Sequence, residues 1–309
     1  MPNEARKKDE TPVKNLKLGI IGLSTGNGHP YSWSAIFNGY DHKYMQDCPF
    51  PAIPDYLSKQ RFPEAAISNA RVTQIWTQEH KVSEHVAKSA KIDNIATNYE
   101  DLIGKVDAVL LARDDYEKHY EMSIPFIEAM LPVYIDKPIA VNTYEAERIF
   151  ASEKYSGQVF TCSALRFASE FSLNEKDKEE IGDIKSVSAH VSGPWDKYAI
   201  HIIEPVLKII GDQGEVTHCE KNITEDSTSL KTTWSSGVRT EFSAIEVSKS
   251  PMIIRIFGEK GEKELIFGDT FNAFKSALQE FVSICLKTKE NNCKEFSLKT
   301  VSIIEKGLK

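Results

Sequence analysis

The sequence predicts two domains: an α/β domain with a doubly wound parallel sheet, followed by an α+β domain with a mostly antiparallel sheet and flanking helices. In the first half, short apolar strands alternate with helix-forming segments, which is the pattern of crossover units in a parallel sheet. In the second half, strands that alternate in hydrophobicity are separated by turns such as Ser235-Ser236-Gly237. The chain has 309 residues, enough for two domains with their own cores.

The first half opens with an apolar strand that runs into a glycine-rich turn. This strand is expected over residues 16–22, and a helix over 31–37 follows the turn. Further strands are predicted at 72–76, 106–112, 133–135 and 159–163, with helices at 82–90, 120–130 and 144–154. These elements place the α/β domain at 15–163, preceded by a polar tail over 1–14 that we expect to be flexible.

The second half, residues 164–309, is predicted to form the α+β domain. A strand is expected over 184–191 and a helix over 198–210. Four more strands, at 229–234, 239–245, 253–257 and 264–267, lead to a long final helix over 271–288.

Residues 38–69 form a long connection that is rich in proline and aromatic residues. A long loop within a compact domain is usually functional or mobile. A surface excursion with a small core of its own explains the aromatic residues equally well. Both interpretations stay open at this point.

Composition excludes several classes of protein. The net charge of −7 argues against a nucleic-acid binder, and no apolar run is long enough to span a membrane. The N-terminus has no apolar signal segment. The five cysteines are scattered and form no Cys-x-x-Cys pair, so we expect reduced thiols, no metal site and a cytoplasmic location.

The first strand ends in a turn that could bind a cofactor phosphate. Gly22, Gly26 and Gly28 lie between the strand and the next helix, where missing side chains let the backbone approach a pyrophosphate. Ser24 stands in place of the second glycine of the usual pattern. Such a turn is often only a structural turn, so it is a weak motif by itself.

The second strand ends without the acidic residue that usually binds the adenosine ribose. Thr77 holds that position. Glu79 could reach the ribose instead, or His80 and Lys81 could accept a 2′-phosphate. The cofactor is therefore expected to be NAD or NADP, with both left open.

Taken in order, the motifs of the chain resemble the Gfo/Idh/MocA family of NAD(P)-dependent sugar oxidoreductases. The resemblance covers nearly the whole chain after the tail. Its carriers are Gly19-Ile20-Ile21-Gly22, Tyr99-Glu100-Asp101-Leu102, Val106-Asp107-Ala108-Val109, residues 111–119, Asp136-Lys137-Pro138, Arg166-Phe167, Ile181-Gly182-Asp183-Ile184 and the helix around His201. It implies a dinucleotide-binding Rossmann domain over 15–163 and a substrate and oligomerisation domain over 164–309. It also implies a carbohydrate substrate and a homo-oligomer, either a dimer or a tetramer.

The resemblance also implies catalytic residues. Lys137, in Asp136-Lys137-Pro138, matches the lysine of the family's Glu-Lys-Pro, between nicotinamide and sugar. Pro138 restricts Lys137 to an extended backbone. His201 matches the family's histidine, while Lys197 occupies the aspartate position, so Tyr198 is expected to help place the substrate hydroxyl. We expect His201 to exchange the proton and Lys137 to stabilise alkoxide character, although the two roles could be exchanged.

Further residues receive binding roles by the same comparison. His29, beside the turn, could touch cofactor or substrate, or could simply mark a helix start. His119 is expected to be structural. The expected cofactor-binding residues are Gly22, Ser24, Gly26, Gly28, Thr77, Ala112, Arg113 and Lys137, and the expected substrate-binding residues are Arg166, Asp196 and Lys197.

The expected activity is hydride transfer between nicotinamide and a sugar, a sugar derivative or a nucleotide sugar. Two alternatives remain. One is a cofactor-retaining epimerase or lyase that oxidises its substrate transiently. The other is a catalytically silent nucleotide-sensing protein.

Overall fold

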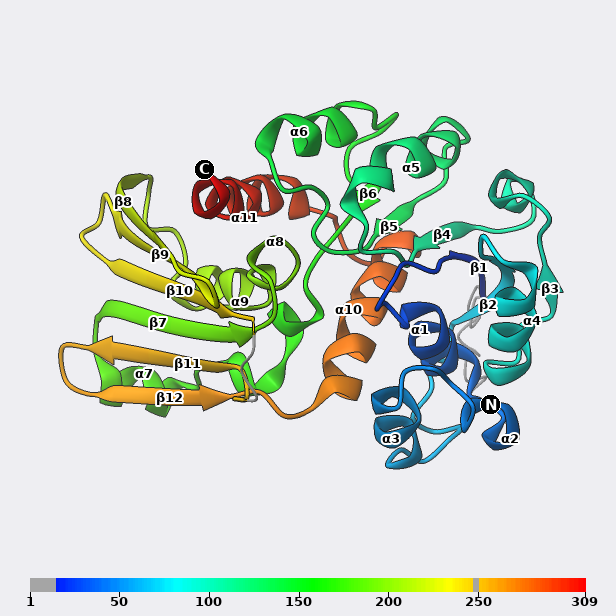
Figure 1. The fold of residues 1–309 in the computed structure, drawn as a ribbon, viewed down its shortest axis with the longest axis horizontal. Helices are drawn as coiled ribbons and strands as arrows, with labels where there is room; N and C mark the ends of the chain where they lie inside the picture. The colour runs from blue at the N-terminus through cyan, green and yellow to red at the C-terminus, as the bar shows by residue number, and fades with distance from the viewer. Residues whose placement is uncertain (1–14, 247–249) are drawn as a thin grey trace, which may run out of the picture.

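A computed structural model describes residues 15–246 and 250–309 of the chain, so the predicted tail over 1–14 lies outside the described residues. Two six-stranded sheets lie on opposite sides of the molecule and helices pack between and around them (Figure 1). The first sheet is parallel throughout and the second is mostly antiparallel, which confirms the predicted fold class.

The first sheet has the strand order β3-β2-β1-β4-β5-β6. Its order reverses between β1 and β4, and in doubly wound sheets ligands bind beyond the carboxyl ends of the strands at such a point. Apolar runs predicted most of these strands, but β3 is too short to show a pattern. The bounds are β1 (Leu16–Ile21), β2 (Ala70–Trp76), β3 (Asn94–Ile95), β4 (Ala108–Leu111), β5 (Val133–Ile135) and β6 (Val159–Phe160).

Helices follow the strands of the first sheet as crossover connections. The predicted positions of α1, α4, α5 and α6 are confirmed to within a few residues at each end. The bounds are α1 (His29–Asn38), α4 (His80–Ser89), η1 (Tyr99–Leu102), η2 (Tyr116–Lys118), α5 (His119–Glu128) and α6 (Thr143–Ala151).

Residues 38–69 form an excursion that packs on α1. It contains α2 (His42–Met45) and α3 (Ala52–Ser58), and Met45 and Leu57 are fully buried in it. The Tyr56 hydroxyl donates a hydrogen bond to Ser32 of α1. The structure thus favours a surface excursion with a small core of its own.

The second sheet has the order β12-β11-β7-β10-β9-β8, and its single parallel pair is β7 with β10. The sequence prediction missed β8, because nearly every residue of this edge strand is exposed or half-buried and no alternation marks it. The bounds are β7 (Ile184–Ser192), β8 (Val216–Ile223), β9 (Ser227–Trp234), β10 (Arg239–Ile245), β11 (Ile253–Gly258) and β12 (Glu262–Ile266).

The C-terminal helices correct one prediction. The expected final helix over 271–288 ends at Cys285, and a further helix, α11, follows it. Polar and small residues on the buried face of α11, such as Ser297, Thr300 and Gly307, hide its amphipathic pattern. The bounds are η3 (Ala164–Phe167), η4 (Ser169–Phe171), α7 (Glu175–Ile181), α8 (Trp195–Tyr198), α9 (Ile200–Ile210), α10 (Thr270–Cys285) and α11 (Cys293–Leu308).

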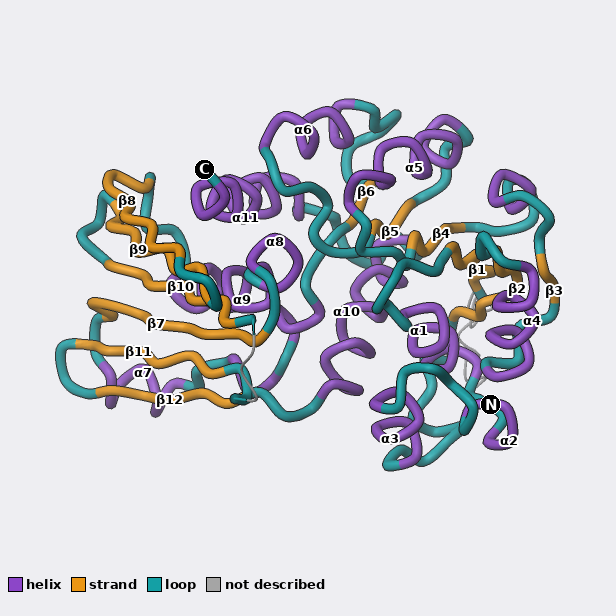
Figure 2. Tube along the Cα trace, in the orientation of Figure 1, coloured by secondary structure: helices purple, strands orange, loops and turns teal. Residues whose placement is uncertain are grey.

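Helix α10 returns from the second sheet to the first, as the tube view makes visible (Figure 2). The ring of Phe281 lies 5.5 Å from that of Tyr134 on β5 and 5.9 Å from that of Phe160 on β6, centre to centre. Phe274 approaches Trp33 of α1. A helix from the second half of the sequence therefore completes the core of the first sheet.

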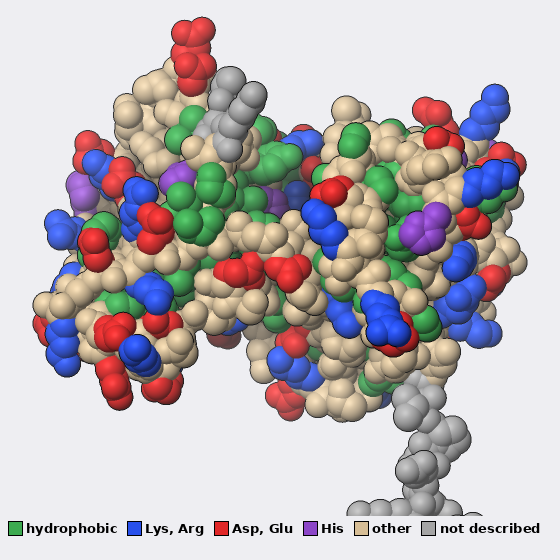
Figure 3. Space-filling view, turned by 90° about the horizontal axis from the view of Figure 1, so that it is seen from below, with side chains coloured by type: hydrophobic (Ala, Val, Ile, Leu, Met, Phe, Trp, Pro, Cys, Tyr) green, Lys and Arg blue, Asp and Glu red, His purple; other side chains and the backbone are tan. Residues whose placement is uncertain are grey.

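The surface seen in Figure 3 carries acidic and basic side chains interspersed with each other. In the part of the chain that the structure describes, no helix is long and apolar enough to cross a membrane.

Candidate active site

A pocket of about 230 Å³ lies beyond the carboxyl ends of β1, β4 and β5, at the reversal point of the first sheet. Helix α9 and the start of α10 form its other walls. Polar and titratable side chains converge on it from four separate segments: Asn27, His29, Asp114, Lys137, Tyr198 and His201.

Lys137 lies at the end of β5 with its side chain only 8% exposed. Its Nζ is 3.8 Å from Oδ2 of Asp114 and 5.8 Å from the centre of the Tyr198 ring. The amine therefore lies inside the pocket, beside a carboxylate and over an aromatic face.

Asp114 is the central carboxylate of the pocket, and the sequence interpretation did not assign it a role. It accepts a hydrogen bond of 2.6 Å from Ser24 Oγ and lies 3.8 Å from Nζ of both Lys137 and Lys197. One signal could have identified it. Asp114 follows β4 as Lys137 follows β5, and the ends of neighbouring parallel strands meet at one edge.

His201 and Tyr198 reach the pocket together, although the helix that carries them is interrupted at Ala199. Their ring centres are 5.7 Å apart in an edge-on arrangement. Gly193 leaves the space that the Tyr198 ring fills, since a Cβ there would lie 2.6 Å from the ring. His201 Nδ1 shares a hydrogen bond of 2.8 Å with Ser163 Oγ.

The charge state of His201 follows from its surroundings. Burial, and after it the nearby positive charges of Lys137 and His29, hold the pKa of His201 well below its usual range. The imidazole is therefore neutral at neutral pH and can donate or accept a hydrogen bond.

A buried ion pair supports His201 from behind. Glu204 accepts a hydrogen bond of 2.8 Å from the Ser163 amide, and Arg166 Nε lies 3.8 Å from the same carboxylate. Burial raises the pKa of Glu204 to about 7, against the opposing effects of Arg166 and the amide. Arg166 also packs on the rings of Phe167 and Phe296. It does not line the pocket, so the structure places this expected substrate ligand behind the site.

The other two expected substrate ligands also lie outside the lining of the pocket. Lys197 reaches the pocket only through its ion pair with Asp114. Asp196 accepts a hydrogen bond of 3.2 Å from the Tyr116 hydroxyl, which ties α8 to the segment after β4. This contact joins the two halves of the molecule beside the pocket.

The three glycines of the turn have different environments. A Cβ on Gly22 would collide with Pro30 of α1, and one on Gly28 would lie 2.6 Å from Phe50 and from Ile53. Both glycines are therefore required by protein packing. Gly26 has a φ of +81° and open space around it, so only Gly26 offers an unfilled approach of the kind that a pyrophosphate needs.

The backbone amides of the turn also favour binding at Gly26. Pro30 has no amide hydrogen, and the His29 amide donates to Asn27 Oδ1, so the start of α1 has little to offer an anion. Within the described residues, the exposed amides of Thr25 and Gly26 donate to no protein acceptor. The turn can thus hold a cofactor phosphate on its loop amides.

Three other expected cofactor ligands are engaged elsewhere. The Thr77 hydroxyl bonds Glu79 O and Ser83 Oγ, both at 2.8 Å, and Arg113 bonds Asp115 and Gln78. Ala112 is fully buried beside β1. None of these three residues lines the pocket, and their contacts are with the surrounding protein. Gln78 was missed by sequence reasoning, yet its side chain bonds both the N–H and the C=O of Leu23 in the turn.

His29 lines the pocket and bonds a buried carboxylate. Its Nδ1 lies 2.5 Å from Oδ2 of Asp136, which also accepts a hydrogen bond of 2.8 Å from Asn27 Nδ2. Burial would raise the pKa of Asp136, but His29, Lys137 and Asn27 together hold it below its usual value. His119, by contrast, is buried with its ring nitrogens near the carbonyls of Ile139 and Arg113, in a structural position.

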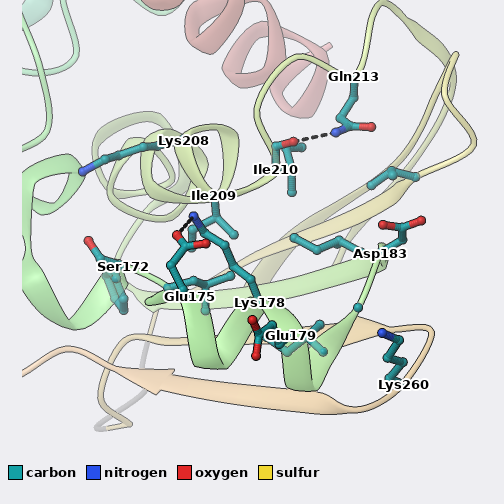
Figure 4. A pocket seen from close by; sticks show the side chains of 16 residues that line it. Ser172, Glu175, Lys178, Glu179, Asp183, Lys208, Ile209, Ile210, Gln213 and Lys260 are labelled. Atoms are coloured by element: carbon teal, nitrogen blue, oxygen red, sulfur yellow. Dashed lines mark hydrogen bonds and ion pairs between the residues drawn. The ribbon is translucent and has the colours of Figure 1, made fainter.

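A larger pocket of about 870 Å³ lies away from this site, between α7, the end of α9 and the turn at Lys260 (Figure 4). None of the expected site residues lines it. Two of its polar side chains bond within its own wall, Lys178 to Glu175 and Gln213 to the Ile210 carbonyl. The titratable side chains of the larger pocket are all exposed, whereas Asn27, Asp114 and Lys137 of the smaller pocket are buried at the reversal point of the parallel sheet, which identifies the smaller pocket as the candidate active site.

Solved structures with the same fold span nearly the whole chain. A myo-inositol 2-dehydrogenase from Lactobacillus plantarum has a TM-score of 0.73 at 16% identity, covering 94% of this chain and 96% of that one. A scyllo-inositol dehydrogenase from Lactobacillus casei has a TM-score of 0.71 at 14% identity, covering 95% of each chain. GenD2 from gentamicin A biosynthesis, solved in complex with NAD, has a TM-score of 0.73 at 12% identity, covering 98% and 96%.

Comparison with curated protein sequences finds no match. Residues 53–163 match the family described as "Oxidoreductase family, NAD-binding Rossmann fold", that is Gfo/Idh/MocA. This segment contains β2 to β6 of the parallel sheet, the pocket residues Asp114 and Lys137, and Asp136, which bonds His29. Over these residues the chain is similar to the Gfo/Idh/MocA family of oxidoreductases, and over nearly its whole length it has the fold of the solved structures above.

Proposed function

We propose that the protein is an NAD(P)-dependent dehydrogenase or reductase whose substrate is a sugar, a sugar derivative or a nucleotide sugar. Cyclic polyols such as the inositols are the first compounds to test, because inositol dehydrogenases share the fold. The observation that carries the proposal is the convergence of Lys137, His201 and Tyr198 on one pocket at the reversal point of the parallel sheet.

The residues present fit a nicotinamide dinucleotide. The open Gly26 and the free amides of the turn would hold its phosphates, and the nicotinamide would lie towards Lys137. When bound, the cofactor accepts hydride from, or returns hydride to, a carbon of the substrate. Gly22, Ser24, Gly28, Thr77, Ala112 and Arg113 would shape this site largely by packing and by hydrogen bonds within the protein.

The chain's own groups would hold and polarise the reacting hydroxyl. Lys137 brings a positive charge that stabilises alkoxide character on the substrate oxygen. Tyr198 and the neutral His201 would position that oxygen through hydrogen bonds. Asp114 would hold Lys137 in place and moderate its charge, and Lys197 would balance Asp114. Arg166 would support these residues from behind through Glu204, and Asp196 would hold α8 in place through Tyr116.

The first experiment compares thermal shifts with NAD(H) and NADP(H), then assays a panel of inositols, sugars and nucleotide sugars by the absorbance of reduced nicotinamide. We expect one cofactor pair to stabilise the protein and at least one panel compound to change the absorbance. Cofactor that stays bound through purification, with no net absorbance change, would indicate transient oxidation in an epimerase or lyase instead.

The variant Lys137→Met tests the role of Lys137 in the reaction. Lys260→Met, in the larger and distant pocket, is its control. Lys137→Met should keep the thermal shift and lower kcat by about 10²-fold or more, because the charge that stabilises the alkoxide is lost. Near-normal turnover of Lys137→Met would remove Lys137 from the reaction. A cytoplasmic location remains a prediction from the composition, and a homo-oligomeric state, dimer or tetramer, remains a prediction from the family resemblance.

A further inference from the structure

The pocket contains two histidines whose partners differ. His29 Nδ1 faces the carboxylate of Asp136 at 2.5 Å, and His201 Nδ1 faces the hydroxyl of Ser163 at 2.8 Å. Both rings line the same pocket as Lys137. Either ring is therefore a candidate to accept the proton of the substrate hydroxyl.

The Asp136 carboxylate is only 1% exposed and is built to stay ionised. Oδ2 accepts hydrogen bonds from Asn27 and His29, and Oδ1 accepts the Lys137 amide at 2.8 Å. A carboxylate held by three donors requires a proton on Nδ1 of His29. The neutral ring is thereby restricted to the tautomer with its lone pair on Nε2.

The position of the His29 ring is also fixed. It stacks on Trp33 with ring centres 4.8 Å apart and meets Phe274 of α10 edge-on at 5.0 Å. Within the described residues, Nε2 has no hydrogen-bonding partner in the protein. The ring is 16% exposed at the pocket wall, so Nε2 is available to a ligand.

We propose that His29, held in one tautomer by the buried carboxylate of Asp136, is the group that takes the proton from the substrate hydroxyl and returns it in the reverse direction. This inference rests on the proposed function. Asp136 is a positioning residue, because it acts only through His29. His201 keeps the role of a neutral hydrogen-bonding group.

The step is balanced in atoms and charge. During oxidation the O–H bond breaks, its proton bonds Nε2 of His29, and the electron pair of that bond forms the carbonyl as hydride leaves the same carbon for the cofactor. The imidazolium that results is stabilised by Asp136, as in a carboxylate–histidine pair. A proton on His201 would be bonded at Nδ1 to the neutral Ser163 hydroxyl and not to a carboxylate, and it would lie near the positive charge of Lys137.

The charged and titratable groups around His29 come from several segments of the pocket. They are Asp136 and Lys137 after β5, Asp114 after β4 with its partner Lys197, Tyr198 on α8 and His201 on α9. The pH profile of the wild type must therefore be compared with the pH profiles of variants at these positions.

The first test needs no substrate. Long-range ¹H–¹⁵N spectra of the full-length protein with NAD, recorded where the His29 ring is neutral, report which nitrogen carries the proton. We expect Nδ1–H in the wild type. Asp136→Asn should weaken this preference for Nδ1–H, because a neutral carboxamide with one acceptor oxygen cannot accept from Asn27, His29 and the Lys137 amide together. A wild-type ring with its proton on Nε2 would overturn the proposal.

The second test uses kinetics with an active compound of the panel. His29→Ala should lower kcat by on the order of 10²–10⁴-fold and abolish the acid limb of the pH profile, whereas added imidazole should restore part of kcat. His201→Ala should keep the acid limb. His85→Ala is the control, because His85 bonds Tyr31 outside the pocket and its variant should not respond to imidazole.

A His29→Ala variant that keeps the acid limb, or that imidazole does not rescue, contradicts the proposal. If the wild type proves inactive with the whole panel while still binding NAD, the proposed function fails. The tautomer measurement then still decides whether the pair of His29 and Asp136 has the proposed arrangement.

Discussion

Glu204 shows how burial alone can change the chemistry of a single residue. Its carboxyl is 1% exposed behind His201, and among the described residues the Ser163 amide bonds it and Arg166 pairs with it. Burial disfavours the ionised form, so the pKa rises from 4.5 to about 7. The folded protein therefore keeps a proton there that the unfolded chain has released at the same pH.

This shift leads to a prediction about stability and pH. Between about pH 4.5 and 7 the folded state binds more protons at Glu204 than the unfolded state, so the free energy of unfolding falls as pH rises. Glu204→Gln should remove a decline on the order of 1–3 kcal/mol from this range.

Urea unfolding at pH 5 and pH 8 measures this difference, and Glu179→Gln on the exposed face of α7 is the control. The glutamine can still accept the Ser163 amide, so the local backbone should stay in place. An unchanged difference between the two pH values in Glu204→Gln would show that Glu204 titrates normally.

At the scale of elements, the connection from β1 to α1 separates two uses of glycine. Gly22 and Gly28 allow protein atoms to approach, whereas Gly26 combines a positive φ with open space. The sequence interpretation gave Gly22 the same role in the approach of the pyrophosphate as Gly26 and Gly28. The structure fills the space beside Gly22 with Pro30, so substitution of Gly22 is expected to disturb the packing of α1 on the sheet in addition to any effect on the cofactor.

Gly26→Ala should weaken binding of NAD(P) at least tenfold, because a methyl group enters the phosphate approach. Gly104→Ala is a matched control, since Gly104 has a φ of +80° and open space, but follows η1, before β4. Both variants should lose about 1 kcal/mol of stability from the same backbone strain. Calorimetric titration with NAD and NADP checks the difference, and equal affinities for the two variants would exclude Gly26 from the site.

At the scale of the whole molecule, the predicted boundary near residue 163 separates the two sheets but not the two cores. Helix α10 covers Tyr134 and Phe160 of the first sheet, and Phe271 contacts Phe62 of the excursion over 38–69. Asp196 and Tyr116 add a contact between the two halves beside the pocket. The parallel sheet therefore depends on a segment more than a hundred residues further along the chain.

We expect the protein to unfold in one cooperative transition, and Phe281→Ala to cost about 3–5 kcal/mol, because it opens a cavity among Tyr134, Phe160 and the helix. Scanning calorimetry measures both, with the exposed Phe257→Ala as a control that should change stability little.

A fragment of residues 15–163 should not fold stably. Two separate transitions, or a stably folded fragment, would show that the domains are independent.

The sequence by itself determined what depends on neighbours along the chain. Apolar runs and alternation predicted most strands of both sheets, and the order of strands and helices predicted the parallel sheet. The position of Lys137 at the end of a buried strand was equally visible. These features are local because burial of one face imposes a period on adjacent residues.

Tertiary structure decided the features that join distant segments. Ser24 and Asp114 are 90 residues apart, and Asn27 and Asp136 are 109 residues apart, yet each pair shares a hydrogen bond in the pocket. The exposed edge strand β8 and the polar buried face of α11 lack the periodic signal that would reveal them. Sequence alone could not show which carboxylate meets His29, because the packing of α1 against the end of β5 creates that contact.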